Sequence, residues 1–187
     1  MKVIAGSAKG RELKYPKLPK SKRLRPLTGR AKEALFNILV HKNPDARFLD
    51  LFAGTGSVGI EALSRGAKLA IFVEHDRKIA ETLRENLEMT GFTDQSEVHC
   101  LDVIKALQFL AKEQRVFDII FIGAPYGSPL LDEALKEIGA SGLVEKGGVV
   151  VAEHSDRDAT ADSYGKISRA RDAEYGDTVL SFYTIGG

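Results

Sequence analysis

The sequence predicts an α/β fold: a mostly parallel sheet with helices on both faces, closed by an antiparallel hairpin. Short apolar runs recur along the chain, and segments with helical spacing of apolar residues separate them. Such alternation is typical of parallel strands joined by crossover helices. The apolar runs occupy residues 46–52, 69–74, 96–101, 117–123 and 148–154, and the helical patterns begin near Ser57, Arg77, Val103 and Pro129. Residues 166–185 add two extended segments around a Tyr175-Gly176-Asp177 turn, so we expect a seven-stranded sheet.

Charge divides the chain into a basic arm and an acidic domain. Residues 1–32 hold 11 Lys and Arg against one acid, Glu12, which leaves 16 bases and 25 acids for residues 33–187. The two parts therefore carry formal charges of +10 and −9. Because phosphate neutralisation supplies most nonspecific affinity for nucleic acids, we predict a small RNA-binding extension at 1–32 and a cofactor domain at 33–187. A solvated tail is the alternative interpretation of the charge run.

A helix is predicted where the arm meets the domain. Thr28 is a candidate N-cap, and apolar residues follow at helical spacing from Ala31 to Leu39. That apolar face would pack on the domain and leave basic side chains exposed at the helix or its entry. The residues expected to contact RNA are Arg11, Arg23, Arg25, Thr28, Arg30 and Lys32.

Composition argues against several other classes of protein. No apolar run approaches the roughly 18 residues that a membrane span needs, so we expect a cytoplasmic protein without a membrane segment, and a monomer. The four histidines and the single cysteine show no spacing that would gather metal ligands on one face. No metal site is predicted.

Residues 48–76 contain the pattern that points to a cofactor. An apolar strand ends at Asp50, a turn with Gly54, Gly56 and Gly59 leads into a helix, and the next strand ends at Glu74. Glycines in such a turn let backbone N–H groups approach a ligand at the helix N-terminus. Glu74 is placed to accept both hydroxyls of a ribose. The unit is therefore predicted to bind a cofactor that contains a nucleoside.

Two classes of cofactor fit the glycine spacing, since it also matches the dinucleotide fingerprint. Asp50 separates them, because a carboxylate at the mouth of a pyrophosphate site would repel the phosphates. S-adenosylmethionine carries an ammonium and a sulfonium and no phosphate. It is therefore the predicted cofactor, which favours a Rossmann-like class I methyltransferase fold. An NAD-type dehydrogenase and a tight turn without a ligand are the alternatives.

Other strand ends are expected to complete the site, since ligands of open parallel sheets lie outside the carboxyl ends of the strands. Asp102 follows the third run, where it could accept a hydrogen bond from an adenine amino group. Each acid alone could cap a helix, but three at successive strand ends favour a site. The residues predicted to bind the cofactor are Asp50, Phe52, Ala53, Gly54, Thr55, Gly56, Glu74, His75, Asp102 and Val103.

The chain resembles the RsmD family of 16S rRNA guanine-N2 methyltransferases over nearly its whole length. The similarity lies in the opening VIAGSAKGRELKYP, the basic segment LRPLTGRAKEALFNIL, the cofactor motifs FLDLFAGTGSVGIEALSRGA and FVEHD, and the terminal YGDTVLSFY. The resemblance implies methyl transfer from S-adenosylmethionine to the exocyclic amine of a guanine, in 16S rRNA or a small-subunit assembly particle. It also implies that Arg25, Thr28, Arg30 and Glu33 lie in a segment that faces the substrate.

The predicted catalytic segment departs from the family pattern. Where the family has Asp or Asn, then Pro-Pro and an aromatic residue, this chain has Gly123, Ala124, Pro125 and Tyr126. In the family motif the first side chain and a backbone carbonyl accept the two amine N–H groups and align the nitrogen lone pair. Losing one such contact costs about 2.7 to 4 kcal/mol, a hundredfold to a thousandfold in rate. We therefore expect intact cofactor binding and lowered turnover, with the Tyr126 ring stacked on the flipped base.

Two other functions stay open from the sequence. The first is a catalytically impaired or inactive family member that binds rRNA without methyl transfer, which would explain Gly123 directly. The second is a small-molecule methyltransferase, which would leave the charge of the arm unexplained.

Overall fold

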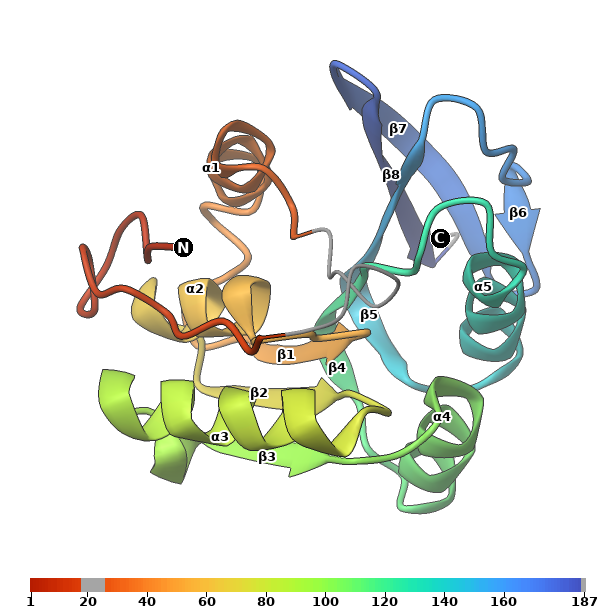
Figure 1. The fold of residues 1–187 in the computed structure, drawn as a ribbon. Coiled ribbons are helices and arrows are strands. Elements are labelled where there is room, and N and C mark those ends of the chain that lie inside the picture. The colour runs from red at the N-terminus through yellow and green to blue at the C-terminus, as the bar shows by residue number, and fades with distance from the viewer. Residues whose placement is uncertain (18–25, 186–187) are drawn as a thin grey trace.

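The computed structural model describes residues 1–17 and 26–185, which form one eight-stranded sheet between two layers of helices (Figure 1). The strand order is β3-β2-β1-β4-β5-β8-β7-β6. The first five strands are parallel, and β8 joins β5 in the antiparallel sense. The strands are β1 Arg47–Leu51, β2 Leu69–Val73, β3 Ser96–His99, β4 Phe117–Ile122, β5 Val144–Ser155, β6 Ser163–Tyr164, β7 Ile167–Tyr175 and β8 Thr178–Ile185. The predicted α/β class is confirmed.

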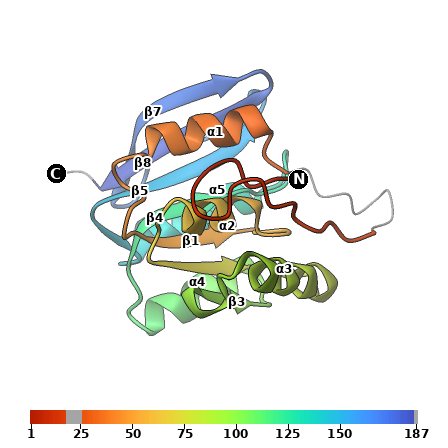
Figure 2. The same ribbon diagram turned by 90° about the vertical axis from the view of Figure 1, so that its left-hand side faces the viewer.

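The helices begin within about a residue of the positions that the apolar spacing predicts. They are α1 Gly29–Ile38, α2 Ser57–Ser64, α3 Arg77–Thr90, α4 Val103–Lys112 and α5 Leu130–Ala140, with a 3-10 turn at Thr93–Gln95. Helices α1, α2 and α3 cover one face of the sheet, and α4 and α5 cover the other (Figures 1 and 2). Each layer contributes fully buried leucines to its own core, such as Leu35 of α1 and Leu107 of α4.

The predicted count of seven strands is wrong by one. The additional strand, β6, is only two residues long and pairs with the start of β7 around Gly165. A strand of two residues is too short to show alternation of apolar and polar side chains, so the sequence pattern missed it. The predicted terminal hairpin is confirmed: β7 and β8 pair in the antiparallel sense across Gly176, which has φ +64°.

The sheet has one point where its strand order reverses. β1 pairs with β2 on one side and β4 on the other, and the chain passes from β3 at the edge to β4 at the centre. The connections after β1 and β4 therefore leave in opposite directions, which opens a crevice outside the carboxyl ends of these strands. This crevice is the expected place for a ligand.

Residues 1–17, the first described part of the basic arm, belong to the same folded unit as the sheet. Val3, Ala8 and Leu13 are buried in the core that α1 and α2 share, and a backbone bridge joins Lys2 to Glu12. The predicted boundary between residues 32 and 33 falls inside α1. A division at this point would cut a helix whose buried face packs on the sheet.

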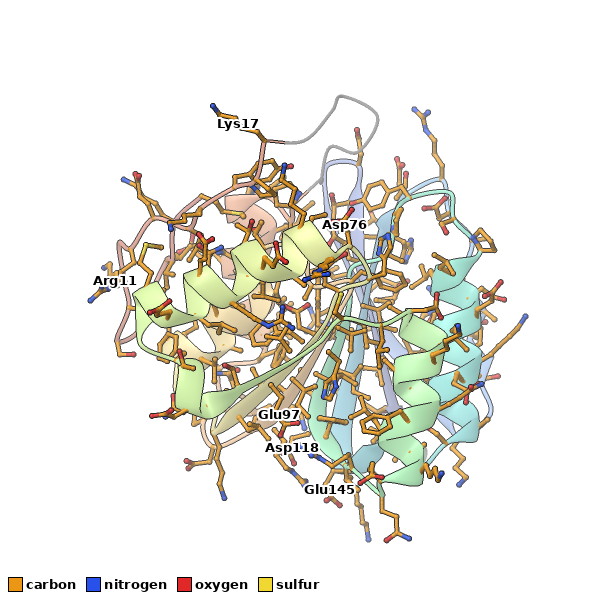
Figure 3. All side chains as sticks on the ribbon, turned by 60° about the horizontal axis from the view of Figure 1, so that its bottom comes forward. Arg11, Lys17, Asp76, Glu97, Asp118 and Glu145 are labelled. Carbon is orange, nitrogen blue, oxygen red and sulfur yellow. The ribbon has the colours of Figure 1, made fainter. Side chains whose placement is uncertain are left out.

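Charged residues at the amino ends of the strands stabilise the fold away from the crevice. Arg47 forms ion pairs with Asp118, at 3.0 Å, and Glu145, at 2.9 Å. Figure 3 shows Asp118 and Glu145 at the opposite end of the molecule from Asp76, which begins α3. These contacts give Asp118 a structural role. Within the described part of the chain, no helix is both long enough and apolar enough to cross a membrane.

Candidate cofactor and substrate site

A cavity of about 460 Å³ lies at the carboxyl ends of β1, β2, β4 and β5. This volume is within the range of small-molecule sites. Four carboxylates line it, and no Lys or Arg does among the described residues. The lining residues are Tyr15, Pro26, Leu27, Asp50, Phe52, Ala53, Gly54, Thr55, Ser57, Val58, Glu74, His75, Asp76, Ile79, Phe121, Gly123, Ala124, Pro125, Tyr126 and Glu153. The cavity therefore suits a ligand that carries positive charge and no phosphate.

The passage from β1 into α2 depends on glycine at two positions, one in the turn and one in the first turn of the helix. Gly56 has φ +85°, and a Cβ there would lie 2.2 Å from Leu83 Cδ1. A Cβ at Gly59 would lie 2.3 Å from the Phe72 ring. Because no side chain intervenes, the first turn of α2 packs directly on the sheet, and the Gly59 N–H donates to Asp50 Oδ2 at 2.8 Å.

Asp50 is a buried carboxyl group at the base of the cavity, with 1% of its surface exposed. Burial raises its pKa to about 7, the hydrogen bond from Gly59 opposes this rise, and the charges of Glu74 and Glu153 add to it. The group is therefore poised to change charge near neutral pH. A cation bound in the cavity would favour its ionised form.

Glu74 is held rigidly at the end of β2. Its Oε2 accepts from the Gly54 N–H and its Oε1 accepts from the Asp76 N–H, both at 2.9 Å. The side chain is almost fully buried but lines the cavity. Each carboxylate oxygen has a second lone pair, so Glu74 can also accept from two neighbouring hydroxyls.

The structure brings together most of the residues that the sequence assigned to a cofactor. Three of them, Gly56, Asp102 and Val103, do not line the cavity. Asp102 is the N-cap of α4, where its Oδ1 accepts from Ile104 and Lys105. Asp76 caps α3 and also lines the cavity.

The residues predicted to contact RNA differ in their placement. Arg11 and Arg30 are exposed, and Arg11 Nη1 donates to the Met89 carbonyl at 2.9 Å. Thr28 caps α1, since its Oγ1 accepts from the Ala31 N–H. The remaining arginines, Arg23 and Arg25, lie outside the described residues.

The expectation that Lys32 is exposed is wrong. Its side chain is 2% exposed, and its Nζ lies 3.2 Å from Glu61 Oε2 and 3.1 Å from Ser57 Oγ. Burial lowers the pKa of Lys32, and the adjacent carboxylate of Glu61 opposes this shift. The sequence interpretation placed Lys32 on the exposed side of α1, but Lys32 shares the buried face of the helix with Leu35 and Phe36, and its Nζ donates to the Lys2 carbonyl at 3.2 Å.

Two features of the site were missed by sequence reasoning. Tyr15 and Leu27, which both belong to the basic arm, line the cavity. Glu153 also lines it, from near the carboxyl end of the apolar strand β5. A carboxylate inside the run GVVVAEH was the signal that could have revealed Glu153, because buried acids are rare without a partner or a function.

Comparison with known proteins identifies the family. The family model described as "Conserved hypothetical protein 95" matches residues 1–184. The chain belongs to this family. Within it, "Putative rRNA methyltransferase YlbH" of Bacillus subtilis is 37% identical over the full length of both chains. Ribosomal RNA small subunit methyltransferase D of Escherichia coli is 34% identical, over 82% of this chain and 74% of that protein. The resemblance to the RsmD family is thereby confirmed.

The fold of the family is also seen in solved structures. A hypothetical protein of Thermus thermophilus superposes with a TM-score of 0.85 at 32% identity, over 99% of each chain. The mostly parallel sheet with antiparallel C-terminal strands is therefore a shared architecture.

Proposed function

We propose that this protein transfers a methyl group from S-adenosylmethionine to the exocyclic N2 of a guanine in small-subunit (16S) rRNA. The observation that carries the proposal is the cavity at the strand reversal, where four carboxylates and no described Lys or Arg face the ligand. A dinucleotide would bring a pyrophosphate against Asp50. The names of the relatives support the reaction and do not favour a noncatalytic role.

The residues of the cavity fit the methyl donor. Glu74 is placed to accept the ribose hydroxyls, and the glycine turn exposes backbone beside it. Asp50 supplies negative charge for the cationic end of the donor. When bound, S-adenosylmethionine supplies an electrophilic methyl group on a sulfonium.

The end of β4 is suited to receive the target base. An exocyclic amine is a weak nucleophile, because its lone pair is delocalised into the ring, and acceptors for its N–H groups help to localise the pair. Gly123, Ala124 and Tyr126 line this part of the cavity, so backbone carbonyls here are candidate acceptors and the Tyr126 ring is a candidate stacking surface. The exposed Arg11 and Arg30 supply positive charge for the rRNA backbone.

The reaction is tested by nucleoside mass spectrometry. Small-subunit rRNA lacking its modifications, and particles assembled from it, are incubated with the protein and isotopically labelled S-adenosylmethionine. We expect labelled N2-methylguanosine, and boiled protein is the control. Binding of the RNA without any labelled nucleoside would favour the noncatalytic alternative.

The buried Asp50 predicts that donor affinity depends on pH. Since its pKa is about 7 in the free protein, a cation that requires the ionised form must displace a proton at lower pH. The affinity for S-adenosylmethionine should rise by up to about tenfold from pH 6 to pH 8. Calorimetry in two buffers of different ionisation enthalpy would reveal the released proton. Asp50→Asn should remove this dependence on pH. Titration of the donor itself affects the wild-type protein and the variant equally. An identical pH profile for the two proteins would contradict the assignment of Asp50 as the titrating group.

A further inference from the structure

The strand next to Gly123 places a carboxylate beside the missing side chain. β4 and β5 are parallel and in register, with Ile122 opposite Ala152, so Gly123 and Glu153 follow at equivalent positions. Side chains alternate along a strand, and both positions face the layer that contains α1 and α2. Gly123 and Glu153 are therefore neighbours on the same face of the sheet.

Distances at Gly123 locate the carboxylate more closely. A Cβ built on Gly123 would lie 3.7 Å from Glu153 Oε2 and 3.9 Å from the Leu51 carbonyl oxygen. An aspartate oxygen is two bonds from its Cβ, so Glu153 Oε2 lies near the space that a family side chain at this position would reach. Glu153, on the adjacent strand, therefore places a carboxylate oxygen close to where the acceptor missing at Gly123 would lie.

Glu153 is oriented by the residue expected to stack on the base. The Tyr126 hydroxyl donates to Glu153 Oε1 at 3.0 Å, and it also lies 3.0 Å from Thr178 Oγ1 on β8. Only 6% of the Glu153 surface is exposed, and this residue lines the cavity. A carboxylate held in this way is preorganised, which is what an acceptor in a transition state requires.

We propose that Glu153 accepts an N–H of the target guanine amine in place of the side chain absent at Gly123. This inference rests on the proposed function. As the N2–methyl bond forms from the nitrogen lone pair, the sulfur–methyl bond breaks and its electron pair stays on sulfur. The surplus N2 proton passes to the Glu153 carboxylate and from there to solvent. Charge and atoms balance, because the donor loses its positive charge and one proton is released.

The test measures kcat for rRNA methylation in variants of Glu153. Glu153→Ala should lower kcat roughly a hundredfold to a thousandfold. Glu153→Gln should lose less, because its amide oxygen still accepts a hydrogen bond, and it keeps the shape of the side chain should the alanine variant fail to fold. Glu133→Gln on the exposed face of α5 is the matched control and should keep the wild-type kcat. Melting temperatures verify that each variant is folded.

Restoring the family side chain gives the sharper result. Gly123→Asp should raise kcat at least about tenfold in the Glu153→Ala background, where the position of the acceptor is vacant. In the wild-type background it should not raise kcat, since it adds a second carboxylate beside Glu153 and a Cβ only 3.1 Å from the Phe121 ring. An equal gain in both backgrounds would overturn the proposal.

A binding measurement gives a readout besides activity. In ligand-observed NMR, the wild-type protein should bind guanosine more tightly than inosine, which lacks the 2-amino group, and Glu153→Ala should bind the two alike. If Glu153→Ala or Glu153→Gln leaves both kcat and the preference for guanosine unchanged, the role proposed for Glu153 is refuted, whereas the proposed function is not. If the wild-type protein makes no N2-methylguanosine, the proposed function itself fails, and the inference fails with it.

Discussion

Replacing Glu61 by alanine should lower the free energy of unfolding by about 3 to 5 kcal/mol. Glu61 is fully buried on α2, and its carboxylate pairs with Lys32 and with Arg65, whose Nε lies at 2.8 Å. It also accepts the backbone N–H groups of Ile4, at 2.8 Å, and Ala5, at 2.9 Å. Alanine would leave the buried Lys32 ammonium without its counter-ion and two backbone donors without their acceptor, so the arm, α1 and α2 would lose a common anchor.

Urea unfolding followed by circular dichroism measures this loss. Glu81 provides the matched control, because it forms an exposed ion pair with Arg77 on α3, with side chains 56% and 88% exposed. Glu81→Ala should cost no more than about 1 kcal/mol. Equal effects of the two substitutions would show that the buried pair does not anchor the arm.

The second large effect is expected at Glu74, on donor binding. Hydrogen bonds to charged groups contribute about 1.5 to 3 kcal/mol each. Glu74→Ala removes the acceptor for two ribose hydroxyls and releases the Gly54 and Asp76 N–H groups. The dissociation constant for S-adenosylmethionine should therefore rise roughly a hundredfold to ten-thousandfold.

Calorimetry with S-adenosylhomocysteine and S-adenosylmethionine measures the effect at Glu74. Both ligands carry the same ribose, so the loss should be similar for the two. Glu88→Ala, on the exposed side of α3, is the control and should leave both affinities unchanged. A Glu74→Ala variant that binds either ligand as tightly as the wild-type protein would exclude Glu74 as the ribose acceptor.

The fold was predictable because its signals are local. Strands β1, β2, β4 and β5 are buried on both faces, so each appears in the sequence as a nearly continuous apolar run between helical segments. Thr28 caps α1 as predicted, because capping depends on a residue and the three that follow it. Among the strands that the structure describes, β6, two residues long, is the one that was not predicted.

The site was less predictable because its contacts are made between distant segments. Lys32 was expected to be exposed although it shares the buried face of α1 with Leu35 and Phe36, and its partners Lys2 and Glu61 belong to other segments of the chain. Glu153 belongs to the site through the pairing of β4 with β5, which brings together residues thirty positions apart. No pattern within either segment contains that information.

The most direct test of the central claim, that this cavity holds a phosphate-free methyl donor, is a crystal structure of the protein with S-adenosylhomocysteine. Both ribose hydroxyls should lie within hydrogen-bond distance of Glu74, with the amino-acid end of the ligand toward Asp50. An empty cavity at saturating ligand, or a dinucleotide bound there with its pyrophosphate against Asp50, would contradict it.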